Sequence, residues 1–506
     1  MSVDVESIVV SVLRSLRERL KRVRRAANTQ FASLSLFSPR DIVLIGWVGV
    51  ATLITLNVVF RFVIRRFIHR QTGLPVLPRS WPISIFQIRL FTLAPERLVL
   101  LIGASVLVFG LLTAYVCSER DSIIPVLGGG SVLLVLTNSL QGEFRGLVWP
   151  LAFNGSYYRA AVRITNPVRF VRTYVENQLE LPLHATTHPP GSVLTPYLFD
   201  QLFGSAHISV ASIQHVSIAM GVVSLVISGY LLYRLLGTYF EPELTQYVTF
   251  LFVLLPAVQI YYLASIDAVI LTVFLGAVYC FTRESRIIAW IGTFCCLVLA
   301  AWHTFMAVFL VPVLGGIALY RRDRIGMVVA QFIGVAAFYL GVDVVLGYNY
   351  IDSFLIASKQ QTVAATQYIT PTAEQVRTST ASGGFLLFVD PVKYVFTRIE
   401  DVAEIALFFT PYLCVLCARG VSALRARREA LVVFAVGVLS LCGLFAAGVY
   451  HTGETARGAM YIYPFLLLPV AALLRSVDVT RRDKWVLAAL VFAQTVLMQI
   501  IGFYRW

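Results

Sequence analysis

The sequence predicts an all-α polytopic membrane protein with about thirteen transmembrane helices, and at least eleven. The first observation is composition: 58% of the 506 residues are hydrophobic, 13% are charged, and the mean hydropathy is +0.78. In a typical soluble domain about a quarter of the residues are charged. The second observation is that many apolar runs approach the roughly 20 residues needed to cross the hydrocarbon core. Such runs must satisfy their own backbone hydrogen bonds, so they are predicted to be helices.

The arginines indicate how these helices alternate across the membrane. The predicted spans lie near 41–60, 97–117, 123–139, 208–233, 246–263, 268–282, 287–302, 304–320, 326–346, 401–418, 430–449, 459–474 and 486–503. Much of the net charge of +14 lies in short connectors beside them, which predicts a cytoplasmic side for those connectors. No basic domain with interleaved aromatic residues exists, so nucleic acid is excluded as a partner. The long polar connectors 140–207 and 347–400 then lie together on the outer side.

Five segments follow from this scheme. Residues 1–40 are expected to be a cytoplasmic amphipathic segment, and 41–120 an N-terminal transmembrane hairpin. Residues 121–346 form the transmembrane core with its outer loop, 347–400 a second outer loop that acts as a lid, and 401–506 the C-terminal helices. The connector 61–96 fits least well, because it is rich in arginine yet falls outside.

The seven cysteines all lie in or at the ends of apolar runs. Cys414 and Cys417 form one CxxC, but no second ligand pair lies nearby. We therefore interpret the cysteines as small buried side chains rather than disulfides or metal ligands.

Polar and ionisable residues collect on the predicted outer side. Ionisable groups at membrane depth are costly and occur mostly where a cavity or partner compensates them. The candidates for a polar site are Glu143, Tyr157, Tyr158, His184, His188, Asp267, His303, His451, Glu454 and Arg457. Simpler roles remain open for several of them: His303 as an interfacial residue, Asp267 as a helix N-cap, the tyrosines as belt residues, and Glu454 with Arg457 as an i, i+3 salt bridge.

The stretch "HATTHPPG" is the most unusual of these. His184 and His188 have the spacing of a zinc pair, but the glutamate of HExxH is absent and Pro189 favours extended backbone at His188. The Pro-Pro-Gly is instead predicted to be a rigid entry to a short helix over 191–204, which is too short to span.

Three stretches carry a resemblance to a known family. They are "YYRAAVRITNPVRFVRTYVENQLELPLHATTHPPG", "PAVQIYYLASIDAV" and "HTGETARGAMYIYPF". In this order they resemble the integral-membrane glycosyltransferases of the GT-C superfamily, in a subgroup related to the protein mannosyltransferases and aminoarabinose transferases. The resemblance covers roughly residues 120–475.

The resemblance implies a GT-C fold and the transfer of a sugar from a polyprenyl-phosphate donor, such as a dolichol phosphate, to a lipid, glycan or protein. It implies an active site on the non-cytoplasmic side of the cell membrane. Family members carry an acid near the tyrosine that opens the loop helix, but here that stretch reads "FNGSYYRAA". Glu143 is therefore the candidate general base, with His188 as the second catalytic residue. Arg457, with His188 and His451, is expected to hold the carrier phosphate, and the remaining candidates to bind substrate.

Some members of the superfamily use a divalent metal ion, so such a cofactor stays open, with no metal ligand assigned. Two other functions also stay open. The chain could be a transporter or flippase that moves a glycolipid without chemistry, or a catalytically degenerate partner of another transferase.

Overall fold

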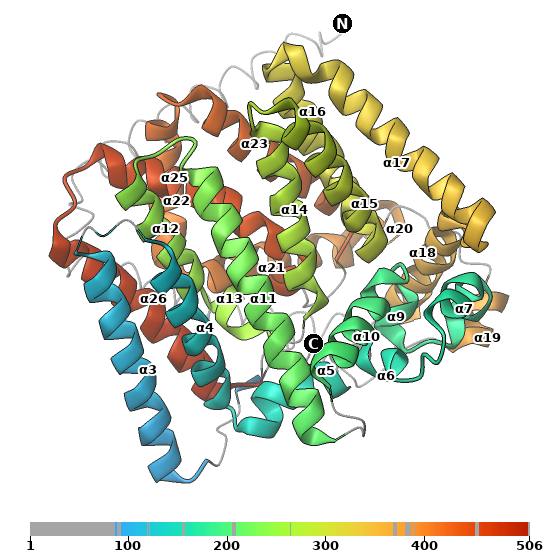
Figure 1. The fold of residues 1–506 in the computed structure, drawn as a ribbon, viewed down its shortest axis with the longest axis horizontal. Coiled ribbons are helices and arrows are strands. Elements are labelled where there is room, and N and C mark those ends of the chain that lie inside the picture. The colour runs from blue at the N-terminus through green and yellow to red at the C-terminus, as the bar shows by residue number, and fades with distance from the viewer. Residues whose placement is uncertain are drawn as a thin grey trace, which may run out of the picture. The chain divides into compact units, whose positions relative to one another are not determined.

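The computed structural model describes residues 87–88, 93–118, 120, 122–153, 157–204, 209–263, 265–367, 372–379, 386–389, 391–450 and 455–503. These parts are almost entirely helical (Figure 1). Their one sheet pairs β1 (Gln87–Ile88) with β2 (Gly502–Phe503) in antiparallel register. The expected N-terminal segment 1–40 and the span 41–60 lie outside the described residues.

Five described helices are long and apolar enough to cross a membrane, and a sixth span results if one bent pair counts as one. They include α3 (Pro95–Val116), α11 (Val210–Leu236), α23 (Arg428–Ala446) and α26 (Arg481–Ile501). The fifth is α17 (Ile325–Leu346) with the turn η5 (Arg322–Arg324) before it. All five coincide with predicted spans, which supports the α-helical membrane class.

Five other predicted spans correspond to shorter apolar helices, so the total of thirteen stays a prediction. These are α4 (Ile124–Ser139), α14 (Ile266–Thr282), η3 (Ile288–Gly292) with α15 (Thr293–His303), η4 (Phe305–Phe309) with α16 (Leu310–Tyr320), and η6 (Met460–Ile462) with α25 (Tyr463–Ser476).

The two remaining predicted spans are broken helices. The run 246–263 divides into α12 (Pro242–Leu254) and α13 (Pro256–Tyr261). The run 401–418 is not a straight span: α21 (Pro391–Phe409) and α22 (Pro411–Leu424) meet at 99°. Both breaks precede a proline, which disfavours helical backbone in the residue before it.

Polar side chains of α26 satisfy carbonyl groups close to both breaks. The Thr495 hydroxyl donates to the carbonyl of Leu254 at 2.8 Å, and the Gln494 amide donates to the carbonyl of Leu407 at 2.8 Å. Unsatisfied backbone groups are very costly in the bilayer core, so such partners allow a helix to break there. The C-terminal helix therefore stabilises both breaks.

The connectors gather at two ends of the helices. At one, which we call the basic end, Arg475 pairs with Glu241 at 2.7 Å and Arg321 pairs with Glu429 at 2.5 Å. The Tyr247 hydroxyl donates there to the carbonyl of Lys484 at 2.8 Å. These are connectors that the arginine pattern assigns to one side, so their grouping agrees with the predicted alternation.

The opposite end, which we call the site end, holds the loop 140–207 as a set of short helices (Figure 1). They are η1 (Phe144–Val148), α5 (Trp149–Phe153), α6 (Tyr157–Ala161), α7 (Pro167–Arg172), α8 (Tyr174–Asn177), η2 (Gln178–Glu180), α9 (Leu183–Thr186) and α10 (Gly191–Phe203). Helix α10 confirms the short helix that the Pro-Pro-Gly predicts.

The second loop is more regular than its composition suggests. It contains α18 (Tyr350–Gln367), α19 (Ala373–Thr378) and α20 (Leu386–Val389), and α21 begins within it. Ser353, Ala357, Gln360 and Val363 bury one face of α18, and the Gln178 amide donates to the carbonyl of Ser353 at 3.0 Å. The described part of this loop therefore packs as helices against the first loop.

Candidate functional site

A largely buried ion pair lies at the site end. Arg457, on the short helix α24 (Thr455–Gly458), places Nε 3.2 Å from Oδ2 of Asp267 in the first turn of α14. The two side chains are 13% and 15% exposed. The N-cap of α14 is Ser265 rather than Asp267: its hydroxyl accepts from the Asp267 amide at 3.1 Å and donates to the carboxylate at 2.8 Å. The Ser265 hydroxyl and the Arg457 guanidinium thus both orient the Asp267 carboxylate.

His188 lies near enough to this pair for both charges to shift its pKa. Burial lowers the pKa of His188 to about 4; the negative charge of Asp267 raises this pKa, and the charges of His184 and Arg457 lower it. The ring is therefore neutral near pH 7. Its Nδ1 lies 3.0 Å from the carbonyl oxygen of His184, which can only accept, so Nδ1 carries the proton and Nε2 is an acceptor. The Tyr157 ring meets the imidazole edge to face at 5.5 Å.

The Pro-Pro-Gly that follows His188 is fixed by close packing. A Cβ atom on Gly191 would lie 2.2 Å from Cδ1 and 2.3 Å from the carbonyl oxygen of Trp302. The Tyr174 hydroxyl donates to the carbonyls of His188 at 2.6 Å and Ala185 at 2.8 Å. These contacts hold His188 in place, as the rigid entry to α10 predicts.

Two further predicted site residues form hydrogen bonds between helices. The Tyr158 hydroxyl donates to Asp200 at 2.6 Å; burial, and then this hydrogen bond, raises the pKa of Tyr158. His303 Nε2 lies 2.7 Å from the Thr195 hydroxyl, and Nδ1 donates to the Leu299 carbonyl at 2.7 Å. Both side chains have polar contacts that account for their burial. His184 is half-buried beside Tyr157, with ring centroids 6.5 Å apart.

Glu143 occupies a different environment from the other candidates. Its side chain is 68% exposed and faces Arg97, with Oε1 and Nη1 3.8 Å apart. The contacts found among the described residues do not join Glu143 to His188 or Asp267. His451 and Glu454, the remaining candidates, lie outside the described residues.

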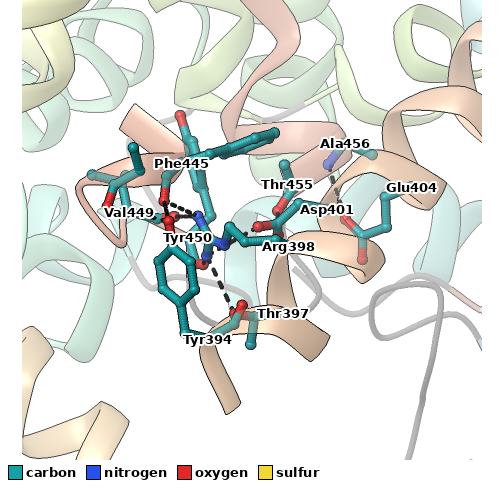
Figure 2. Close-up of polar contacts among 11 residues, drawn as sticks. Tyr394, Thr397, Arg398, Asp401, Glu404, Phe445, Val449, Tyr450, Thr455 and Ala456 are labelled. Atoms are coloured by element: carbon teal, nitrogen blue, oxygen red, sulfur yellow. Dashed lines mark hydrogen bonds and ion pairs between the residues drawn. The ribbon is translucent and has the colours of Figure 1, made fainter. Parts of the chain in front are cut away.

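A group of charged residues on α21 was missed by the sequence analysis (Figure 2). Asp401 and Glu404 are fully buried, and Arg398 pairs with Asp401 at 3.0 Å. The signal was present in "RIEDVAE", which has four charged residues at the start of a predicted span. Ionisable residues in such a position indicate a functional or tightly packed polar site.

Tyr450 connects this group with the Asp267–Arg457 pair. Its hydroxyl donates to the carbonyl of Gly458 at 2.9 Å and lies 2.7 Å from the Tyr461 hydroxyl. Burial is the main cause of the raised pKa of Tyr450; Tyr461 adds to it, and so do the negative charges of Asp267 and Asp401. Asp267 and Asp401 thus both lie near the Tyr450 hydroxyl, at the same end of the protein.

An apolar cavity of about 560 Å³ lies between α15, η4 and α16 on one side and α17 with α18 on the other. Tyr339 and Tyr350 line it, and the ring of Tyr339 stacks on that of Trp302 with the ring centroids 6.4 Å apart. Tyr348 meets both Trp302 and Tyr174 edge to face. A layer of aromatic rings therefore separates this cavity from the backbone of His188.

No group of three or more His, Cys, Asp or Glu side chains that could hold a metal ion occurs in the part of the chain that the structure describes. The described residues therefore assign no ligands to the divalent ion that the resemblance leaves open. The seven cysteines are free. No family model, curated protein or solved structure matches the chain.

Proposed function

We propose that the chain is a membrane glycosyltransferase of the GT-C type, which transfers a sugar from a polyprenyl-phosphate donor to a lipid, glycan or protein acceptor. The observation that carries the proposal is the buried Asp267–Arg457 pair beside neutral His188. A guanidinium suits the oxygens of a phosphate, and a nearby carboxylate is suited to accept a proton. The site end is the non-cytoplasmic side in this proposal, because the arginine-rich connectors lie at the basic end.

The apolar cavity supports a lipid-linked substrate. It provides room for part of a hydrocarbon chain, and the aromatic layer of Trp302, Tyr339 and Tyr348 lies between it and the loop that carries His188. A substrate with an apolar tail and a charged head matches this combination of an apolar cavity and a cationic group.

The reaction has two requirements that these residues meet. The acceptor oxygen forms a bond to the anomeric carbon of the sugar and loses its proton to a base, while the bond from that carbon to the phosphate oxygen breaks and the phosphate keeps the bonding electrons. Arg457 stabilises the developing charge on the phosphate. A base must lie within reach of the proton, so we assign this role to Asp267 rather than to the exposed Glu143. Nε2 of neutral His188 lies 3.4 Å from the Tyr157 hydroxyl, so a substrate hydroxyl would share this pair of hydrogen-bonding groups.

A second candidate function is transport of a glycolipid. Two broken helices, α12–α13 and α21–α22, favour it, because transporters build their sites from discontinuous helices. The charged groups lie at one end rather than around both breaks, which favours the transferase.

One experiment separates the two functions. The purified protein in proteoliposomes would receive a polyprenyl-phosphate sugar labelled in the sugar, and two products would be measured. A transferase releases free polyprenyl phosphate and moves the label to an acceptor or to water. A flippase exposes intact labelled donor to a membrane-impermeant reagent on the other leaflet, and that result alone would contradict the proposal.

A further inference from the structure

The segment that carries Arg457 is bound by buried acids of α21 (Figure 2). The Thr455 hydroxyl donates to Oδ1 of Asp401, and the amide of Ala456 donates to Oε2 of Glu404 at 3.0 Å. Both carboxylates are fully buried. Thr455 and Ala456 directly precede Arg457, so the two acids contact the chain next to the guanidinium residue.

Arg398, also on α21, binds backbone carbonyls in the segment 445–450, which precedes α24 in the sequence. Its guanidinium donates to the carbonyls of Phe445 at 3.0 Å, Val449 at 2.6 Å and Tyr450. It pairs with Asp401 at 3.0 Å, and its side chain is 13% exposed. Helix α21 therefore holds both the end of α23 and the start of α24.

Burying these charged side chains costs hydration energy. We infer that they serve to fix the position of the backbone at α24 and not only to stabilise the fold. Apolar side chains of similar size often stabilise a protein as well or better. A four-residue helix such as α24 cannot maintain its own conformation. Charge-assisted hydrogen bonds are short and directional, so they fix a backbone segment more tightly than apolar packing does.

We propose that Asp401 and Glu404 are positioning residues for Arg457. They hold the first residues of α24 in the position from which the Arg457 guanidinium pairs with Asp267. The proposal rests on the proposed function for the identity of the anion that Arg457 binds. The contacts to Thr455 and Ala456 themselves do not depend on it.

The test measures how accessible Arg457 is in the full-length protein, in phosphatidylcholine nanodiscs without substrate. Phenylglyoxal modifies exposed guanidinium groups, and mass spectrometry gives the rate at each arginine. In Glu404→Leu the amide of Ala456 loses its acceptor, and we expect Arg457 to react about tenfold faster, from the loss of one charge-assisted hydrogen bond. Glu404→Gln keeps an acceptor oxygen and should restore most of the protection.

Two controls make the result specific to Arg457. Glu429→Gln removes a partly buried carboxylate at the basic end, where it pairs with Arg321, and should leave the rate at Arg457 unchanged. Arg475, 45% exposed at the same end, serves as an internal reference, because general unfolding would change its rate as well. Thr455→Val tests the contact to Asp401 separately and should also accelerate modification of Arg457.

Wild-type rates at Arg457 in both Glu404→Leu and Thr455→Val would overturn the proposal. If Glu404→Leu does not accumulate, Thr455→Val and Asp401→Asn decide. Binding of polyprenyl phosphate by the wild-type protein in the same nanodiscs is measured as well, and it tests the proposed glycosyltransferase function separately from the positioning role. Faster modification in the variants, with no binding of polyprenyl phosphate by the wild type, would keep the positioning role and refute the proposed function.

Discussion

The ion pair between Asp267 and Arg457 should show a measurable energetic coupling. At 3.2 Å, an effective dielectric constant of about 20 gives a Coulomb attraction of about 5 kcal/mol. Desolvation of two side chains that are 15% and 13% exposed offsets much of this attraction. We therefore expect a net coupling of about 1–3 kcal/mol. Removing one partner leaves the other charge largely buried, so each single variant should lose about 3 kcal/mol of unfolding free energy.

A double-mutant cycle measures this coupling. The wild type, Asp267→Asn, Arg457→Gln and the double variant would be unfolded in mixed micelles, and the double variant should lose about 1–3 kcal/mol less than the sum of the single variants. The Arg97–Glu143 pair is a matched control, because its charges are 3.8 Å apart and each side chain is 68% exposed. Exposed pairs couple weakly. A coupling for Asp267 and Arg457 no larger than that of this control would refute the reasoning.

Three further predictions concern packing and protonation. Thr495→Val leaves the carbonyl of Leu254 without its hydroxyl donor and should cost about 1–2 kcal/mol of unfolding free energy, measured in the same micelles. Gly191→Ala places a methyl group against Trp302 and should lower the thermal unfolding temperature, whereas Gly103→Ala, with no atom within 4 Å of the new Cβ, should not. Burial lowers the pKa of His188 from its usual 6.5 to about 4 in the folded protein, so the unfolded state binds its proton first as the pH falls. Stability should therefore decline by up to about 3 kcal/mol between pH 6.5 and 4, and a His188→Gln variant with an unchanged pH profile would contradict this.

Local features of the sequence predicted much of the fold. The lengths of apolar runs predicted α3, α11, α17, α23 and α26, and the Pro-Pro-Gly predicted the start of α10. The arginine connectors grouped at one end as their charges suggested. These features depend on residues close together in the chain, where helix length and proline geometry act directly.

The site depended on contacts that the sequence does not specify. The i, i+3 spacing left open a salt bridge between Glu454 and Arg457, and Glu454 lies outside the described residues; the structure pairs Arg457 with Asp267 of another helix, which no spacing indicates. The bend before Pro411 was missed because hydropathy does not change there, although a residue before proline disfavours helix. Asp401 and Glu404 accept hydrogen bonds from Thr455 and Ala456 at the start of α24, and only the packing of α21 shows that these acids lie next to Arg457 in the fold.

The most direct test of the central claim is the affinity of the purified protein for a polyprenyl phosphate in nanodiscs, compared among the wild type, Arg457→Lys and Arg457→Ala. Lysine keeps the charge but loses the planar guanidinium, so Arg457→Lys should bind measurably more weakly than the wild type. Arg457→Ala should lose about tenfold to a hundredfold in affinity, the effect of one charge-assisted contact. Equal affinity in the wild type and a folded Arg457→Ala variant would contradict the assignment of this site to a lipid phosphate.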